Sequence, residues 1–208
     1  MVATLAIARG FHATGLFPAP WPAANVATVG DPRFVPTPAS SFLGPAIAGY
    51  CGLLIGVGLS RFGFAPLIPA MVEAGWGTAG GYHVAGAFNL AGYLVGAILA
   101  VPTAKRIGPR ATLLIAAVGG SFAFIGSAID VPLAAFAALR FVSGLIGGFL
   151  MIVLPPIIQA AVEPRYKGRV MGLAFAGVGT GFLLSGTALP MIAGLGPGPA
   201  WLGLGLVM

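Results

Sequence analysis

Charged residues are scarce in this chain of 208 residues, which has ten lysines and arginines and only four aspartates and glutamates. They make up 7% of the sequence, against roughly 25% in an ordinary soluble domain. Residues of the AVILMFWYC set make up 58%. A soluble protein of this size must cover its surface with polar groups, and this chain has too few of them. The composition therefore argues against a soluble enzyme, a disordered chain and a nucleic-acid-binding protein, although the net charge is +6.

Residues that carry catalytic or metal chemistry are equally rare. Cys51 is the single cysteine, which excludes an internal disulfide and a cysteine-rich metal site. The two histidines, His12 and His83, are far apart in the sequence. No nucleophile, base or metal cluster stands in the apolar segments, so a membrane-embedded enzyme is disfavoured. We expect no cofactor and no metal.

Long apolar runs dominate the rest of the chain. A membrane-spanning helix needs about 20 mostly apolar residues, whereas a membrane strand needs alternating residues over about 10 positions. Unbroken runs of helical length predict an all-α integral membrane protein with five complete spans, at residues 42–72, 82–102, 111–129, 131–162 and 170–195. A sixth span begins near residue 200 and reaches residue 208, too short to cross. Residues 1–41 are rich in proline and alanine and predict a flexible tail.

The positive residues segregate between the loops. Two lie in the amino-terminal tail, three follow the second span and three follow the fourth: Arg9, Arg33, Lys105, Arg106, Arg110, Arg165, Lys167 and Arg169. The loops after the first, third and fifth spans hold none. Because lysine and arginine mark the cytoplasmic side, we expect a multi-pass protein of the plasma (inner) membrane with a cytoplasmic amino terminus. The positive charge then reports topology and not a nucleic-acid partner.

Glycine pairs four residues apart occur in four of the five spans: Gly52 and Gly56, Gly92 and Gly96, Gly144 and Gly148, Gly177 and Gly181. Small residues at this spacing let membrane helices approach closely. The third span has no such pair. We therefore expect the first, second, fourth and fifth spans to form the close-packed set and the third to be peripheral.

Two arginines, Arg61 and Arg140, lie inside predicted spans. A charge in the bilayer costs at least about 2.5–3.5 kcal/mol and usually faces a cavity or a partner. Asn89 lies at a similar depth, and Tyr93 is one turn further along the same helix face. One hypothesis is that these four residues line a substrate cavity in which the guanidinium groups bind an anion. The alternative is that each arginine bonds backbone carbonyls or buried side chains and only braces the bundle.

Several segments resemble carriers of the major facilitator superfamily (MFS). Arg140–Gly148 (RFVSGLIGG) is similar to the superfamily's fourth-helix motif, and Gly172–Gly181 (GLAFAGVGTG) to its glycine-rich fifth helix. Gly58–Pro69 (GLSRFGFAPLIP) and Asn89–Ala97 (NLAGYLVGA) resemble the YbfB/YjiJ-like branch. The resemblance covers about residues 42–208 and implies the amino-terminal half of the fold.

The loop after the second span departs from the superfamily pattern. Arg106 and Gly108 keep its Arg-x-Gly core, and together with Arg110 they are expected to have a structural or gating role. Lys105 stands where the family has an aspartate that latches the two halves, and Val101 stands where it has a glycine. We therefore do not expect a conventional latch.

The resemblance implies a secondary active transporter that works by alternating access and is coupled to protons. The two intramembrane arginines add the expectation that its substrate is a small anionic or polar metabolite. Family carriers have two six-helix halves with the site between them, so we expect this chain to be partial and a carboxy-terminal half to be missing. No acidic residue lies within a predicted span, so any coupling carboxylate belongs to that half. Its expected partners are the lipid bilayer, the substrate and the second half. A non-transporting accessory protein and a non-functional carrier fragment remain alternatives.

Overall fold

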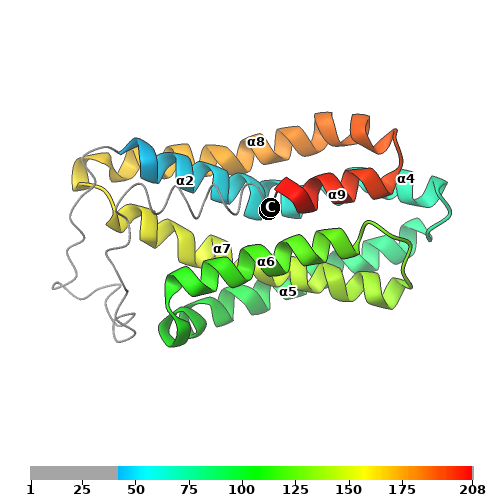
Figure 1. Cartoon of the computed structure of the whole chain (residues 1–208), viewed down its shortest axis with the longest axis horizontal. Helices are drawn as coiled ribbons and strands as arrows, with labels where there is room; N and C mark the ends of the chain where they lie inside the picture. Colours follow the sequence, from blue (N-terminus) through cyan, green and yellow to red (C-terminus); the bar gives the residue numbers. More distant parts are fainter. Residues whose placement is uncertain (1–41, 208) are drawn as a thin grey trace.

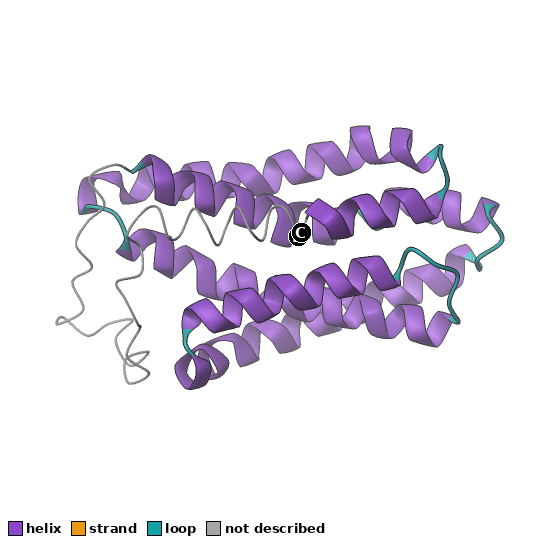
Figure 2. Cartoon of the chain, in the orientation of Figure 1, coloured by secondary structure: helices purple, strands orange, loops and turns teal. Residues whose placement is uncertain are grey.

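The computed structural model describes residues 42–207, and in that part of the chain the structure is helical with short connections and no strands (Figure 2). The tail expected at residues 1–41, with Arg9 and Arg33, lies outside the described residues. Five helical stretches are long and apolar enough to cross a membrane: Leu43–Phe62, Ala79–Ile107, Pro109–Gly126, Leu133–Ala160 and Pro164–Ala193. An all-α membrane bundle with five spans is thus confirmed.

The first span is not one regular helix. It consists of α2 (Leu43–Leu53), the π-helix η2 (Leu54–Leu59) and the short α3 (Ser60–Phe62). The chain then bends and continues as η3 (Ala65–Leu67) and α4 (Ile68–Glu73). The expectation of a single helix over residues 42–72 was therefore wrong. Pro66 lies at this break, and because proline has no N–H to donate to the preceding turn, the regular helical hydrogen bonding cannot continue through it.

The other helices are α5 (Ala79–Ile107), α6 (Pro109–Gly126), α7 (Leu133–Ala160), η4 (Pro164–Tyr166), α8 (Lys167–Ala193) and α9 (Pro197–Val207). The largest change from the expected bounds is at α5, which begins three residues earlier and ends five later. Its start is set by Thr78, whose side-chain oxygen accepts from the Gly81 N–H at 3.2 Å and caps the helix. At its other end Pro102 lies within the helix.

Helices run back and forth along the long axis of the bundle (Figure 1). The turns after α5 and after α7 lie at one end, where α2 begins, and the connections from α4 to α5, α6 to α7 and α8 to α9 lie at the other (Figure 1). The first end therefore carries the basic residues between 105 and 110 and between 165 and 169. The second end carries Glu73 and Asp130. The charge pattern read from the sequence is thus a real asymmetry of the molecule.

Close helix packing occurs at the glycine pairs. A Cβ on Gly92 or Gly96 of α5 would overlap the backbone carbonyl of a residue in α7, and a Cβ on Gly144 would overlap the Asn89 carbonyl in return. Helix α8 meets the first span in the same way, since a Cβ on Gly177 would overlap the Tyr50 carbonyl and one on Gly181 would come within 2.6 Å of the Gly58 Cα. Backbone-to-backbone contact of this kind is possible only without side chains.

Helix α6 packs differently. It lies against α7 and α9, and its glycines face side chains instead of backbone: a Cβ on Gly119 would come within 3.1 Å of the Ile146 side chain, and one on Gly126 within 3.2 Å of the Leu139 side chain. In Figure 1, α6 and α9 run beside each other on one face of the bundle. Two helix pairs joined backbone to backbone, α5 with α7 and α8 with the first span, thus stand beside α6, which packs on α7 through side chains and also contacts α9.

Candidate functional site

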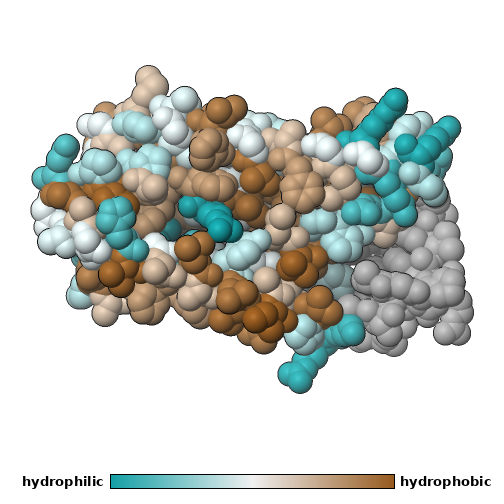
Figure 3. All heavy atoms as spheres, turned by 180° about the vertical axis from the view of Figure 1, so that it is seen from behind, coloured by the Kyte–Doolittle hydropathy of each residue, from teal (hydrophilic) through white to brown (hydrophobic). Residues whose placement is uncertain are grey.

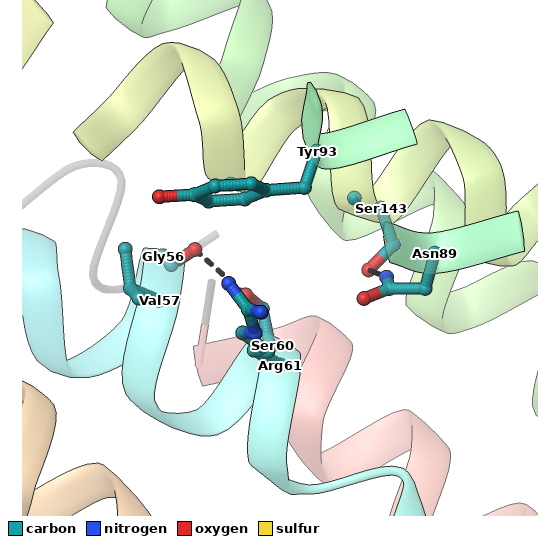
Figure 4. A pocket seen from close by; sticks show the side chains of 9 residues that line it. Gly56, Val57, Ser60, Arg61, Asn89, Tyr93 and Ser143 are labelled. Carbon is teal, nitrogen blue, oxygen red and sulfur yellow. Dashed lines mark hydrogen bonds between the residues drawn. The ribbon is translucent and has the colours of Figure 1, made fainter. Parts of the chain in front are cut away.

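A recess opens where the π-helical part of the first span faces α5 and α7 (Figure 4). It contains about 190 Å³ of empty space including its open mouth. Nine residues line it: Gly56, Val57, Ser60, Arg61, Asn89, Tyr93, Ser143, Gly144 and Gly147.

Arg61 supplies the charge of the recess. Its guanidinium carbon lies 4.7 Å from the centre of the Tyr93 ring, and Figure 4 shows the two side chains facing one another across the recess. Within residues 42–207 the guanidinium has no ion-pair partner and donates no hydrogen bond. The contact with the ring uses no N–H donor of the guanidinium, so these donors stay available for a ligand.

The π-helix η2 ends two residues before Arg61, and part of its backbone borders the same recess. Ser60 donates a hydrogen bond to the Gly56 carbonyl oxygen at 2.6 Å. In a π-helix each N–H bonds five residues back, so the turn is wider than in an α-helix, and such turns are frequent at functional sites. Gly56 and Val57 of this widened turn line the recess directly.

Asn89 and Ser143 form the opposite polar corner. The Asn89 Nδ2 group donates to the Arg140 backbone oxygen at 2.9 Å and to the Ser143 Oγ at 3.4 Å. Both side chains are at least nine-tenths buried. These bonds tie α5 to α7 at the level of Arg61 and fix how Asn89 is turned (Figure 4).

Arg140 does not line the recess, which corrects the expectation that both arginines share one cavity. Its side chain is 0% exposed. The Nη2 group donates to the Ser127 Oγ at 2.8 Å and to the Ala123 carbonyl at 3.4 Å. Four aromatic rings surround the guanidinium, with centroids 4.4–5.8 Å from its central carbon: Trp201, Phe124, Phe136 and Phe64. The bracing alternative describes this arrangement, in which one buried cation joins α6, α7, α9 and the bend of the first span.

The residues expected to have gating roles lie at the basic end. Gly108 connects α5 to α6 with φ +85°, a conformation that L side chains rarely adopt. Pro109 then opens α6 at a position where its missing N–H costs nothing. Arg106 and Arg110 flank this turn. The geometry explains why a glycine stands at 108, and a gating role for the turn stays a prediction.

The sequence predicted that Arg61, Asn89 and Tyr93 line a substrate cavity, and all three line the recess. It gave no functional role to most of the other residues that line the recess. Ser60 precedes Arg61 directly, and Ser143 lies three residues after Arg140 on the same helix face. Polar residues in an apolar span are the signal that would have found both. Val57 and Gly147 carry no signal of their own. No group of three histidine, cysteine or acidic side chains within residues 42–207 could hold a metal ion.

A model of the family described as "Uncharacterised MFS-type transporter YbfB" matches residues 53–208. The chain belongs to this family. The match includes the first-span segment with Arg61, all of α5 and all of α7, so the recess lies entirely within it. No curated protein and no solved structure matches the chain.

Membership of this MFS-type family makes the chain a transporter in general terms and a multi-pass membrane protein. Many large hydrophobic side chains are exposed on the surface, as expected for a protein in a bilayer. Seen from behind, hydrophilic atoms are exposed midway along a largely hydrophobic face, and others gather towards one end of the molecule (Figure 3). Polar groups exposed within an apolar, membrane-spanning surface are costly and mark a candidate functional site.

Proposed function

We propose that this chain is the amino-terminal half of a secondary active carrier that moves a small organic anion across the plasma membrane by alternating access. The recess around Arg61 forms one wall of the substrate site. A second six-helix half completes the site, and the two halves rock about the bound substrate.

The observation that carries this proposal is the unpaired charge of Arg61. Three acidic residues fall within residues 42–207, and each lies at a helix end: Glu73, Asp130 and Glu163. Glu163 pairs with Arg165 at 2.7 Å. Arg61 therefore faces the recess with no anion of its own, and an anionic substrate supplies the missing counter-charge. A guanidinium binds a carboxylate through two parallel hydrogen bonds, which makes this group the natural ligand.

Arg140 supports this assignment by contrast. Its charge is closed off by aromatic rings and by Ser127, so it offers nothing to a ligand in this arrangement. One guanidinium in the recess matches a substrate with one carboxylate there.

Topology and coupling complete the proposal. We propose that the basic end of the bundle and the amino terminus face the cytoplasm, because lysine and arginine are enriched on the cytoplasmic side of membrane proteins. Proton coupling is proposed from the family resemblance. Because no carboxylate of residues 42–207 lies deep in a span, we assign the coupling group to the second half.

The test is uptake in membrane vesicles that contain this chain together with the carboxy-terminal six helices of a transporter from the same family. We expect monocarboxylates to accumulate only when both halves are present, with each half alone as the control. Exclusive uptake of organic cations would refute an anion carrier. Absence of any substrate-dependent flux with both halves present would favour a non-transporting accessory protein.

A further inference from the structure

The hydrogen bonds of Asn89 determine what its amide presents to the recess. A backbone carbonyl can only accept a hydrogen bond, so the group that lies 2.9 Å from the Arg140 oxygen must be the Asn89 NH2. The same nitrogen donates to the Ser143 Oγ. Both N–H donors of the amide are therefore used within the protein.

The amide oxygen of Asn89 is left as an acceptor. No described residue donates to it, and Asn89 is one of the residues that line the recess. Figure 4 shows this oxygen on the side of the amide that faces Ser60 and Arg61. An acceptor held in this orientation requires a donor from a ligand or from water.

Arg61 restricts what kind of donor the ligand can bring. An ammonium group would donate to the amide oxygen, but it would place a second positive charge in a recess that has no acidic residue. A neutral hydroxyl donates without that repulsion. The recess thus combines a cationic fork for a carboxylate with a neutral acceptor for a hydroxyl.

We propose that the substrate is a small hydroxycarboxylate whose carboxylate pairs with Arg61 and whose hydroxyl donates to the Asn89 amide oxygen. The assignment rests on the proposed function of the recess as an anion site. It adds a specific requirement, because a site built to bond a hydroxyl discriminates against the same acid without it.

Matched pairs of acids test the requirement on the full chain in lipid nanodiscs. Affinities are measured by ligand-observed NMR titration for lactate against propionate and for 3-hydroxybutyrate against butyrate. One additional hydrogen bond is expected to make the hydroxylated acid of a pair bind about three- to tenfold more tightly. The methyl ether 2-methoxypropionate keeps the oxygen but has no donor, so it is expected to bind no better than propionate.

Two variants assign the effect to its residues. Asn89→Ala is expected to weaken the hydroxylated acid more than its partner, so that the affinity ratio within each pair falls to about one, whereas Arg61→Gln is expected to weaken both acids of a pair equally and to leave their ratio unchanged. Equal affinities within both pairs in the unmodified protein would overturn the hydroxyl requirement and leave the anion site intact. Failure of all the acids to bind would overturn the anion site itself, and the hydroxyl requirement with it.

Discussion

Replacing Arg61 by glutamine is expected to raise the half-saturating concentration of carboxylate uptake about 10- to 100-fold. Hydrogen bonds to a charged group contribute about 1.5–3 kcal/mol, and each 1.4 kcal/mol is a factor of about ten. Glutamine keeps most of the length of the side chain and removes the charge. The measurement is the concentration dependence of initial uptake in vesicles that contain both halves of the carrier.

Arg165→Gln is the matched control, because it removes the same charge from the same chain. Arg165 is exposed at the basic end, where it pairs with Glu163 and lies over the Tyr166 ring, far from the recess residues in sequence, so its loss is expected to leave uptake unchanged. Arg61→Lys keeps the charge but loses the planar fork, and an intermediate affinity is expected. Normal uptake by Arg61→Gln would show that the recess is not the anion site.

Replacing Gly144 by alanine is expected to lower the free energy of unfolding by about 1–3 kcal/mol. A Cβ at this position would overlap the carbonyl oxygen of Asn89, and backbone cannot rotate away as a side chain can. Helices α5 and α7 must therefore separate along their tightest contact. The measurement is reversible unfolding of the purified chain in a denaturing detergent.

Two other glycines, at which an added Cβ would overlap no neighbouring atom, provide controls. A Cβ on Gly147, three residues further along α7, would meet its nearest described atoms at 3.4 Å and 3.6 Å, which is ordinary contact. Gly179 of α8 has nothing within 4 Å. Alanine at either position is expected to leave stability unchanged or to raise it by up to about 1 kcal/mol through helix propensity. A loss at Gly179 equal to the loss at Gly144 would contradict the packing argument.

Much of the fold could be predicted because a bilayer restricts which backbone structures can span it. Spans must be helical, about 20 residues long and apolar, and these conditions hold for each of the five long helices. The π-helix and the bend near Gly63 could not be predicted from hydropathy, because both lie within one continuous apolar run. Pro66 was the available signal for the bend. The widening at Leu54–Leu59 has no counterpart in the sequence that we can name.

The residues of the site could be predicted only where a single side chain stands out by its own chemistry. Arg61, Asn89 and Tyr93 stand out as polar residues in apolar spans. Arg140 stands out in the same way, yet three of the four rings around it come from other segments of the chain, which no local pattern brings to it. The direction of its long side chain, towards α6 and α9 instead of the recess, is a property of tertiary packing alone.

The most direct measurement of the central claim is NMR of the guanidinium nitrogens of the ¹⁵N-arginine-labelled chain in nanodiscs during a lactate titration. Arg61→Lys and Arg140→Lys samples assign the two intramembrane signals. We predict that the Arg61 signal shifts and saturates with lactate, whereas the Arg140 signal stays where it is because its guanidinium is enclosed by aromatic rings. Saturable shifts confined to the arginines of the basic end, with Arg61 unmoved, would contradict the account.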